Sequence, residues 1–502
     1  MSPTILTLLL LIFGSICFFF LTRRCNPNKT GRKLPPGPRP LPIIGNLHNL
    51  TTLPHRGLQT LSQKYGPIMY LRLGQVPAIV ISSPRAAELF LKTHDVVFAS
   101  RPKIQASDLL SYGSKGMAFS EYGPYWRKVR KLCTVKLLSS SKIESCAALR
   151  KEEVGAVVEA VKGVAAAHGV VDLSEKVGKL VEDISYRMIF GRNKDHRSDL
   201  RELVEEALIL LGAFNVADYA PYLVPFDLQG FTRRLKVVSK KLDTAIEKII
   251  MEHEQAANGD HQDFVDVLLS LMNQPMSPQD EQVFIIDRTN IKAILLDLMG
   301  ASFDTSATTI VWNFSELLRN PRVMKNLQQE LESVFGLDRV VEERDLRQLS
   351  YLDMVVKESF RLHPVAPLLV PRESTEDITI EGFFIPKKSR IIVNTWTIGR
   401  DPNVWSENVE EFYPERFIGG DIDELKGIDF RLLPFGSGRR GCPGIQMGLV
   451  AVRFVLAQLV HCFNWELPSG MQPKDLDMNE SFGLSVGRAN NLFAKPTYRL
   501  AT

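Results

Sequence analysis

The sequence predicts one large, mainly helical domain with a minor β region, placed behind an N-terminal transmembrane helix. Three observations lead to this fold class. Residues 5–21 carry no charge, helical signals dominate the rest of the chain, and no linker, low-complexity tract or repeat follows about residue 60. A chain of 502 residues buries enough apolar surface to fold without disulfide bonds.

The composition excludes several classes of protein. A hydrophobic content of 45% excludes disorder, and a mean hydropathy of −0.04 excludes a multi-span membrane protein. The balance of 61 basic against 57 acidic side chains predicts no nucleic-acid partner. The six cysteines form no CxxC pair, which argues against a zinc module or a disulfide framework and indicates a reducing compartment.

The N-terminus predicts a membrane anchor over residues 1–22. Five basic residues follow the apolar run within residues 23–33, so the positive-inside rule leaves that end in the cytosol. The alternative is a cleaved secretory signal, but positive charge before the run and a small-residue cleavage site after it are both missing. Residues 23–45 are predicted to form a basic, proline-rich hinge that is stiff and extended, and residues 46–502 the catalytic domain.

Strand-like runs occur at residues 68–73 and 78–81, and again at 378–380 and 391–394. Two helices are predicted to begin at Ser83-Pro84 and Asn320-Pro321, each with a capping side chain before proline, and Gly336 is expected to close the second. A proline-free run from about residue 285 to residue 319 has apolar residues at helical spacing, which predicts a single helix crossing the molecule.

The most informative stretch is residues 435–444, FGSGRRGCPG. Its glycines allow a tight loop that approaches a flat ligand, and Pro443 suits the first position of a following helix. Cys442 would then lie at a helix start beside arginines, which favours a thiolate and a single-point metal ligand such as that of haem iron. One alternative is a small buried cysteine. Another is a dinucleotide loop, because residues 436–441 match GxGxxG, but Pro434 interrupts the preceding strand and position 461 is His rather than an acid.

Several distant segments, taken together, resemble the cytochrome P450 family and, within it, the plant microsomal A-type enzymes. The resemblance extends over nearly the whole chain. The matching residues are Trp126 and Arg130 of a WxxxR helix, residues 301–306 of an oxygen-activation motif, Glu358 and Arg361 of an ExxR helix, residues 414–417 (PERF), and Phe435, Gly438, Arg440, Cys442 and Gly444 of FxxGxRxCxG.

The resemblance implies haem b with Cys442 as the axial thiolate ligand of the iron. It implies a cofactor-binding role for Trp126, Arg130, Arg372, Phe435, Arg440 and Cys442, the arginines pairing with the haem propionates. It also implies that Glu358, Arg361 and Arg416 form a buried ion-paired group whose role is structural.

The same resemblance assigns Asp304 and Thr305 to catalysis. Thr305 would pass protons to the oxygen being activated, relayed from Asp304, which would open to a path for water. The alternative is that Thr305 only bonds back to a carbonyl one turn earlier. Ser302 departs from the family pattern, which usually has glycine there, and we expect it to bend the helix by bonding the Leu298 carbonyl.

The implied activity is that of a monooxygenase that hydroxylates a hydrophobic terpenoid, phenolic or polycyclic plant metabolite. By family position, the substrate pocket would be lined by Leu110, Tyr112, Phe119, Ala301, Val365, Leu369, Phe482 and Leu484. This lining has no cationic patch, which favours an uncharged substrate.

The implied electron donor is an NADPH-cytochrome P450 reductase, so NADPH acts indirectly. Lys128, Lys131 and Arg439 are expected to meet an acidic face of that partner. The expected location is the endoplasmic reticulum membrane, single-pass, with the catalytic domain cytosolic. Two other functions remain open: an oxygen-independent rearrangement or dehydration, and a non-catalytic membrane haem-binding protein.

Overall fold

The structure is a computed structural model of the 502-residue chain. It describes residues 32–191, 197–255, 263–274, 285–406, 408–419, 425–468 and 470–501, together with residues 7, 8, 11, 14 and 15. The predicted anchor over residues 1–22 and the first part of the hinge therefore lie outside the described residues, apart from those five positions.

The described chain is mainly helical, as the sequence predicts. The helices are α2 (Pro54–Tyr65), α3 (Pro84–Glu88), α4 (Gln105–Leu110), α5 (Pro124–Leu132), α6 (Ser140–Ser145), α7 (Ala147–Ala166), α8 (Leu173–Phe190), α9 (Arg197–Gly212), α10 (Phe231–Gln255), α11 (Phe264–Leu271), α12 (Arg288–Ser302), α13 (Thr305–Arg319), α14 (Pro321–Phe335), α15 (Ser350–Leu362), α16 (Thr395–Ile398), α17 (Pro402–Trp405) and α18 (Ile445–Cys462). The strands are β1 (Ile68–Leu73), β2 (Val76–Ile81), β3 (Val171–Asp172), β4 (Arg372–Glu373), β5 (Ile378–Ile380), β6 (Phe383–Ile385), β7 (Arg390–Val393), β8 (Phe463–Glu466), β9 (Glu480–Ser481), β10 (Gly487–Arg488) and β11 (Phe493–Tyr498).

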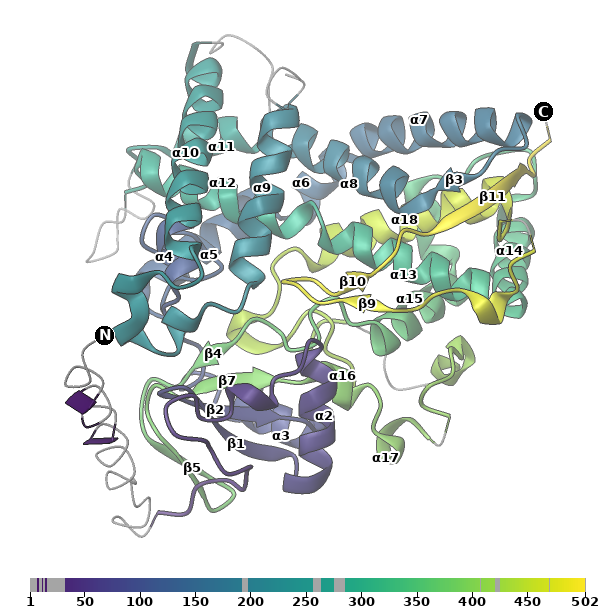
Figure 1. Ribbon diagram of the computed structural model, residues 1–502. Helices are drawn as coiled ribbons and strands as arrows, with labels where there is room; N and C mark the ends of the chain where they lie inside the picture. Colours follow the sequence, from purple (N-terminus) through teal and green to yellow (C-terminus); the bar gives the residue numbers. More distant parts are fainter. Residues whose placement is uncertain are drawn as a thin grey trace.

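The largest sheet has the strand order β1-β2-β7-β4 and lies at one end of the molecule, beside α2 and α3 (Figure 1). β1 and β2 form an antiparallel hairpin, whereas β2 and β7 are parallel, with Ile79 opposite Ile391. A parallel pair needs a crossover, and here the crossover contains most of the helical body. The predicted strands are all present, with bounds shifted by one or two residues for β2 and β7.

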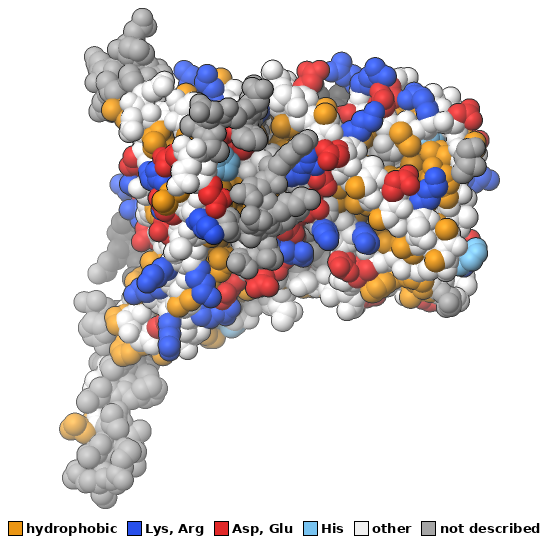
Figure 2. All heavy atoms as spheres, turned by 90° about the horizontal axis from the view of Figure 1, so that it is seen from above, with side chains coloured by type: hydrophobic (Ala, Val, Ile, Leu, Met, Phe, Trp, Pro, Cys, Tyr) orange, Lys and Arg blue, Asp and Glu red, His pale blue; other side chains and the backbone are white. Residues whose placement is uncertain are grey.

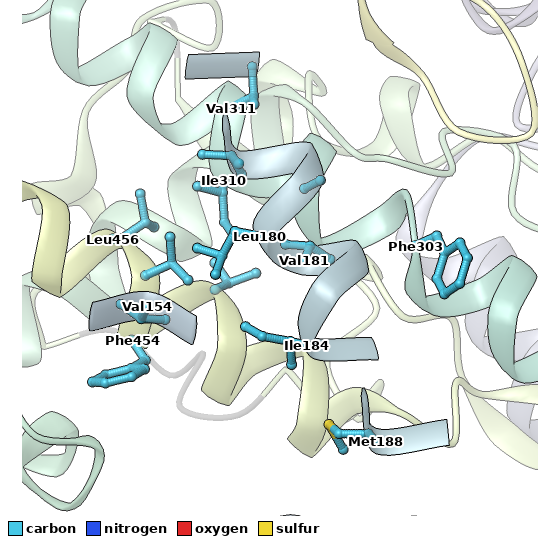
Figure 3. Close-up of a cluster of buried hydrophobic side chains, with 14 of the residues drawn as sticks. Val154, Leu180, Val181, Ile184, Met188, Phe303, Ile310, Val311, Phe454 and Leu456 are labelled. Atoms are coloured by element: carbon cyan, nitrogen blue, oxygen red, sulfur yellow. The ribbon is translucent and has the colours of Figure 1, made fainter. Parts of the chain in front are cut away.

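The helices α7, α8, α13 and α18 meet in the main core. Figure 3 shows Leu180 and Ile184 of α8 facing Ile310 of α13, with Phe454 and Leu456 of α18 beside them. These side chains are buried, because each helix turns an apolar face toward its neighbours. The core therefore fixes α13 against α18, the two helices that border the candidate site.

The predicted long helix is in fact two helices. α12 ends at Ser302 and α13 begins at Thr305, so Phe303 and Asp304 interrupt the run that the sequence predicts as continuous. Ser302 donates its hydroxyl to the Met299 carbonyl at 3.5 Å rather than to that of Leu298, so the expected bond is wrong. By length and composition, residues 288–319 and α18 are long and apolar enough to cross a membrane. Both pack within the core of the described chain.

One of the two predicted helix caps is correct. The Ser83 hydroxyl accepts a hydrogen bond from the backbone N–H of Ala86, as expected for an N-cap. The Asn320 side chain makes no such bond, because its amide donates to the Glu316 carbonyl of the preceding helix at 2.9 Å. Gly336 closes α14 with a φ of 68°, as predicted.

Within the predicted hinge, residues 32–40 have no helix or strand and lie along the sheet, whereas residues 41–45 form a turn. The Tyr70 N–H donates to the Pro36 carbonyl at 2.9 Å, and the Phe384 N–H donates to the Lys33 carbonyl at 2.7 Å. Elsewhere the surface carries mixed charge: on the described part of the face seen in Figure 2, Lys and Arg are interleaved with Asp and Glu.

Candidate functional site

The Cys442 loop is a tight turn that favours glycine at two positions and admits only glycine at Gly438. Gly436 and Gly438 both have positive φ, at 67° and 64°, and a Cβ atom on Gly438 would lie 2.3 Å from the Leu91 carbonyl oxygen. The Cys442 N–H donates to the Phe435 carbonyl at 2.9 Å, which closes the loop. The Phe435 ring packs edge-on against Phe360 of α15, at 5.2 Å between centroids.

One detail of the predicted loop is wrong. α18 begins at Ile445 with Gly444 as its N-cap, so Pro443 precedes the helix rather than opening it. Burial raises the pKa of the Cys442 thiol, whereas the Gly444 backbone and the Arg130 charge act in the opposite direction. Coordination of a metal ion would favour the thiolate.

Four arginine side chains gather around Trp126 beside the loop: Arg101, Arg130, Arg372 and Arg440. The Arg440 guanidinium lies 4.2 Å from the centroid of the Trp126 ring, and Arg130 lies 5.5 Å from it. Arg130 donates to the Gly441 carbonyl at 2.6 Å, and the Trp126 indole donates to the Met117 carbonyl at 3.0 Å. The predicted residues Trp126, Arg130, Arg372 and Arg440 thus come together from α5, β4 and the Cys442 loop.

Positive charge exceeds negative charge in this arginine cluster. Arg372 pairs with Asp95 at 2.8 Å, and Asp95 also accepts from Arg439 at 2.9 Å. Within the described chain, Arg101, Arg130 and Arg440 have no carboxylate within 4.0 Å and bond only to backbone carbonyls. Burial and the neighbouring cations lower the pKa of Arg440 and of Arg101.

Haem fits this donor set. Its propionates are carboxylates, which guanidinium groups bind with paired, charge-assisted hydrogen bonds, and the surplus of buried cations calls for such anions. Cys442 is the cysteine of the loop that carries Arg440, so one loop presents both a sulfur ligand for iron and an arginine for a propionate.

The break between α12 and α13 presents two polar side chains in different directions. The Thr305 hydroxyl donates to the Ala301 carbonyl at 2.7 Å, which is the back-bonded geometry weighed as an alternative to catalysis. Asp304 accepts from the Thr308 hydroxyl at 3.2 Å. Ala301 and Thr305 line one large cavity, whereas Asp304 lines a second cavity.

The large cavity has a volume of about 870 Å³ and mainly apolar walls. Seven of the eight predicted pocket residues line it: Leu110, Phe119, Ala301, Val365, Leu369, Phe482 and Leu484. Tyr112 is not among its lining residues, because the Tyr112 hydroxyl donates to Asp243 of α10 at 2.8 Å. Tyr112 therefore ties its loop to α10, and its placement in the pocket is wrong.

The second cavity, of about 530 Å³, has polar walls between α8, α9, α13 and the C-terminal strands β9 and β10. Glu182, Arg201, Asp304, Thr308 and Arg488 contribute to it. Phe482 and Leu484 line both cavities. Asp304 thus faces a polar space on a different side of the helix break from Thr305.

The ExxR helix and the PERF turn meet in a closed group of ion pairs. Arg361 binds Glu358 at 2.8 Å, and Arg416 binds the same carboxylate at 2.9 Å. Both the Glu358 and Arg361 side chains are 0% exposed. The remaining guanidinium N–H groups donate to the carbonyls of Gly399, Val409 and Glu411 and, from Arg416, to that of Trp405.

Sequence reasoning missed four charged residues of the site: Asp95, Arg101, Asp297 and Arg390. Asp297 lines the large cavity and accepts from the N–H of Ala118 at 2.9 Å, and burial raises its pKa to about 6. Arg390 of β7 also lines the cavity, although no cationic lining was expected. Of the four, only Asp297 gives a signal in the sequence, because it is the single charge inside the apolar run of residues 293–300.

The comparisons with known sequences agree with this geometry. A family model described as Cytochrome P450 matches residues 35–493. Cytochrome P450 CYP736A12 of Panax ginseng is 56% identical over 502 residues, which is 100% of both chains. Desmethyl-deoxy-podophyllotoxin synthase of Sinopodophyllum hexandrum is 40% identical over 493 residues, covering 96% of this chain and 95% of that protein.

Solved structures support the same conclusion. A zebra fish cytochrome P450 solved with abiraterone has a TM-score of 0.73 and 26% identity, covering 89% of this chain and 100% of that chain. A second, solved with progesterone, has a TM-score of 0.74, and its 24% identity makes it a likeness of fold alone. The chain therefore belongs to the cytochrome P450 family of monooxygenases, among its plant A-type members.

Proposed function

We propose that this monooxygenase hydroxylates a hydrophobic plant specialised metabolite, of the terpenoid, phenolic or polycyclic class. The observation that carries the proposal is the large, mainly apolar cavity of about 870 Å³, with Thr305 of the oxygen-activation motif in its wall. Such a cavity excludes water from a small apolar molecule and holds it beside a polar hydroxyl. The name of one relative, Desmethyl-deoxy-podophyllotoxin synthase, also supports a role in specialised metabolism.

Cys442 would hold the iron, and Trp126, Phe435 and the arginine cluster would hold the rest of the haem. Arg130, Arg372 and Arg440 carry the propionate role that the family implies, and the surplus of positive charge supports adding Arg101 to them. When bound, haem supplies the activation of molecular oxygen, and thiolate ligation favours cleavage of the O–O bond.

The chain's own contribution to proton delivery would be Asp304 and Thr305. Asp304 lines the polar cavity and Thr305 the apolar one, so the helix break offers a route from one to the other. A proton taken up at the Asp304 carboxylate would pass to the Thr305 hydroxyl, which would release the Ala301 carbonyl as it donates into the apolar cavity.

The electron donor would be an NADPH-dependent reductase that docks where Lys128, Lys131 and Arg439 are predicted to meet it. Lys131 is exposed at the end of α5, and Arg439 is 46% exposed while it pairs with Asp95. Replacing Lys131 with Glu should slow reduction at low salt without removing haem. If turnover at low salt is unchanged, this docking surface is wrong.

A location at the endoplasmic reticulum membrane is supported by apolar side chains beside the sheet. Tyr219 and Ile44 bond to Gln75 and Gly74 of the β1–β2 turn, which brings two segments together. The exposed apolar residues of these segments and of the loops next to them are Leu41, Ile43, Ile44, Phe214, Tyr222, Val224, Phe226 and Leu228. A patch of this kind, close to the hinge, suits contact with a membrane that the anchor over residues 1–22 would cross.

The test is to express the chain in microsomes with a plant reductase and to offer a mixed library of terpenoids and phenolics. We expect a product heavier by one oxygen atom, formed only with NADPH, by mass spectrometry. The Cys442→Ser variant should lack this product. A product formed without NADPH and oxygen would instead indicate rearrangement or dehydration, and undiminished NADPH-dependent turnover in the variant would contradict the role of Cys442.

A further inference from the structure

Arg390 is a buried cation in the wall of the large cavity. It is 5% exposed and lies on β7, and it shares one face of the strand with Ile392, two residues further on. Among the described residues, none accepts a hydrogen bond from its guanidinium, and its Nε is buried without a partner. A buried donor without an acceptor is costly, so such a group calls for a ligand.

The acids near Arg390 do not neutralise it. Its cross-strand neighbour Glu373 pairs with Lys388 at 2.6 Å instead. Asp218 also lines the cavity, but it accepts from the Gln105 N–H at 2.8 Å. In the part of the chain that the structure describes, no carboxylate oxygen lies within 4.0 Å of the guanidinium. Burial raises the pKa of Asp218, an effect partly offset by Gln105 and by the charge of Arg390.

An aromatic ring packs against the Arg390 guanidinium. The Tyr219 ring lies against it, with 4.7 Å between the guanidinium carbon and the ring centroid, and the Tyr219 carbonyl accepts from the Gln75 N–H at 2.9 Å. Stacking occupies a face of the guanidinium plane and leaves the N–H groups at its edge to bind an acceptor. An edge of this kind matches a carboxylate with two parallel hydrogen bonds.

We propose that Arg390 binds the carboxylate of an otherwise apolar substrate. This inference rests on the proposed function and narrows its substrate class to hydrophobic metabolites that carry a carboxylate, whereas the sequence favoured an uncharged substrate. The carboxylate would lie at the sheet wall of the cavity, near Tyr219, and the apolar body would extend through the cavity toward Ala301 and Thr305. The carbon that is oxidised would then lie away from the acid group.

The test is equilibrium dialysis of the full-length holoprotein at pH 7.5 with dehydroabietic acid, its methyl ester and the corresponding alcohol. We expect the acid to bind about 10- to 100-fold more tightly than the ester or alcohol, the range of charge-assisted hydrogen bonds. Dialysis measures binding whether or not the protein turns over, so this result is independent of the oxygenase test.

Three variants test whether Arg390 causes the preference for the acid. Arg390→Gln should abolish the preference for the acid and change ester binding by less than about threefold, since only the charge-assisted bonds are lost. Arg390→Lys should retain part of the preference, because it keeps the charge without the planar fork. Arg85→Gln, an arginine whose side chain is 71% exposed, is the control for loss of a positive charge and should bind like wild type.

A further variant is expected to change acid binding in the opposite direction, which misfolding would not explain. Asp218→Asn removes a negative charge near the proposed carboxylate and should tighten acid binding while leaving the ester unchanged. Equal binding of acid and ester by the wild type, or a preference that survives Arg390→Gln, would overturn the proposal. Tighter binding of the alcohol would overturn it as well.

Discussion

Two groups of buried charged side chains lie close to the Cys442 loop. They differ in whether the chain itself supplies the opposite charge. In the ExxR group, Glu358 binds both Arg361 and Arg416, and the remaining guanidinium N–H groups donate to carbonyls. In the arginine cluster around Trp126, only Arg372 of the four guanidinium groups pairs with a carboxylate in the described chain, that of Asp95, which also binds Arg439. The first group is nearly complete within the chain, whereas the second keeps a surplus of cations.

The difference separates a structural role from a binding role. A buried ion pair that is satisfied internally holds its elements in place, and removing either partner leaves an unpaired charge. A buried surplus of one sign is unfavourable by itself and is tolerated where an external ion of the opposite sign completes it. The ExxR group therefore belongs to the fold, and the arginine cluster to a ligand with carboxylates.

The largest expected effect comes from breaking the ExxR group. Glu358→Gln leaves two buried arginines without their acid, and we expect a loss of about 3–5 kcal/mol in the free energy of unfolding. Urea unfolding of the holoprotein measures it. The matched control is Glu415→Gln, because the Arg322 partner of Glu415 is 55% exposed and that pair should contribute less than about 1 kcal/mol. Equal losses in the two variants would contradict the comparison.

Asp297 provides a buried charge of a third kind, an acid without a cation. Its pKa is raised to about 6 from the ordinary 3.8, so the folded state binds the proton more tightly than the unfolded chain. The stabilisation from this carboxyl group is present at low pH and is lost as the pH rises from 3.8 to about 6. The complete loss amounts to about 3 kcal/mol. Asp297→Asn should lack this loss.

The measurement for Asp297 is the free energy of unfolding of wild type and Asp297→Asn at pH 5 and pH 7. Relative to the variant, wild type should lose roughly 1 kcal/mol between these pH values. A wild-type protein that gains stability over this range relative to the variant would show that the carboxylate is stabilised in its charged form.

A paired substitution of arginines sharpens the comparison further. Arg416→Gln should reduce stability by about 2 kcal/mol whether or not haem is bound, because its partner Glu358 belongs to the chain. Arg440→Gln should cost less than about 1 kcal/mol in haem-free protein, since repulsion from Arg372 and Arg130 is relieved. It should speed haem release about tenfold, followed by transfer to an excess of apomyoglobin. If Arg440→Gln destabilises haem-free and loaded protein equally, the cluster is structural.

The smallest effect is expected at the surface, where water solvates the charged side chains. Lys103 and Glu121 lie 3.6 Å apart with side chains 75% and 51% exposed. Lys103→Ala should change the free energy of unfolding by less than about 0.5 kcal/mol. This change should disappear at high salt, which screens exposed charges. A larger change that persists in salt would mean that burial is not what separates the other groups.

Much of the site follows from local sequence. The spacing of Gly438, Arg440 and Cys442 identifies the loop, because a positive φ and a close approach to Leu91 admit glycine alone at Gly438. The ion pairs of Glu358 with Arg361 and Arg416 were predicted from the family resemblance, because helix spacing by itself indicates only an exposed Glu–Arg pair. By contrast, the sequence predicted only a bend at Ser302 and not the end of one helix and the start of another, because a helical period continues on both sides of Phe303.

Other features depend on residues that are distant in sequence. Tyr112 was placed in the cavity from its neighbours, but Asp243, 131 residues away, holds its hydroxyl elsewhere. Arg390 was not predicted as a site residue, because β2 and β4, which flank its strand, and Tyr219, which packs on it, are all distant from it in sequence or meet it only in the folded sheet.

By itself, the sequence determined the fold class, four of the strands, the starts of two helices and the loop around Cys442, because turns, caps and apolar periods act over a few residues. Only the tertiary structure decided which charged side chains find a partner of opposite charge within the chain. Pairing needs atoms within about 4 Å of each other, and the chain brings Asp95 to Arg372 and leaves Arg390 facing the cavity only once it has folded.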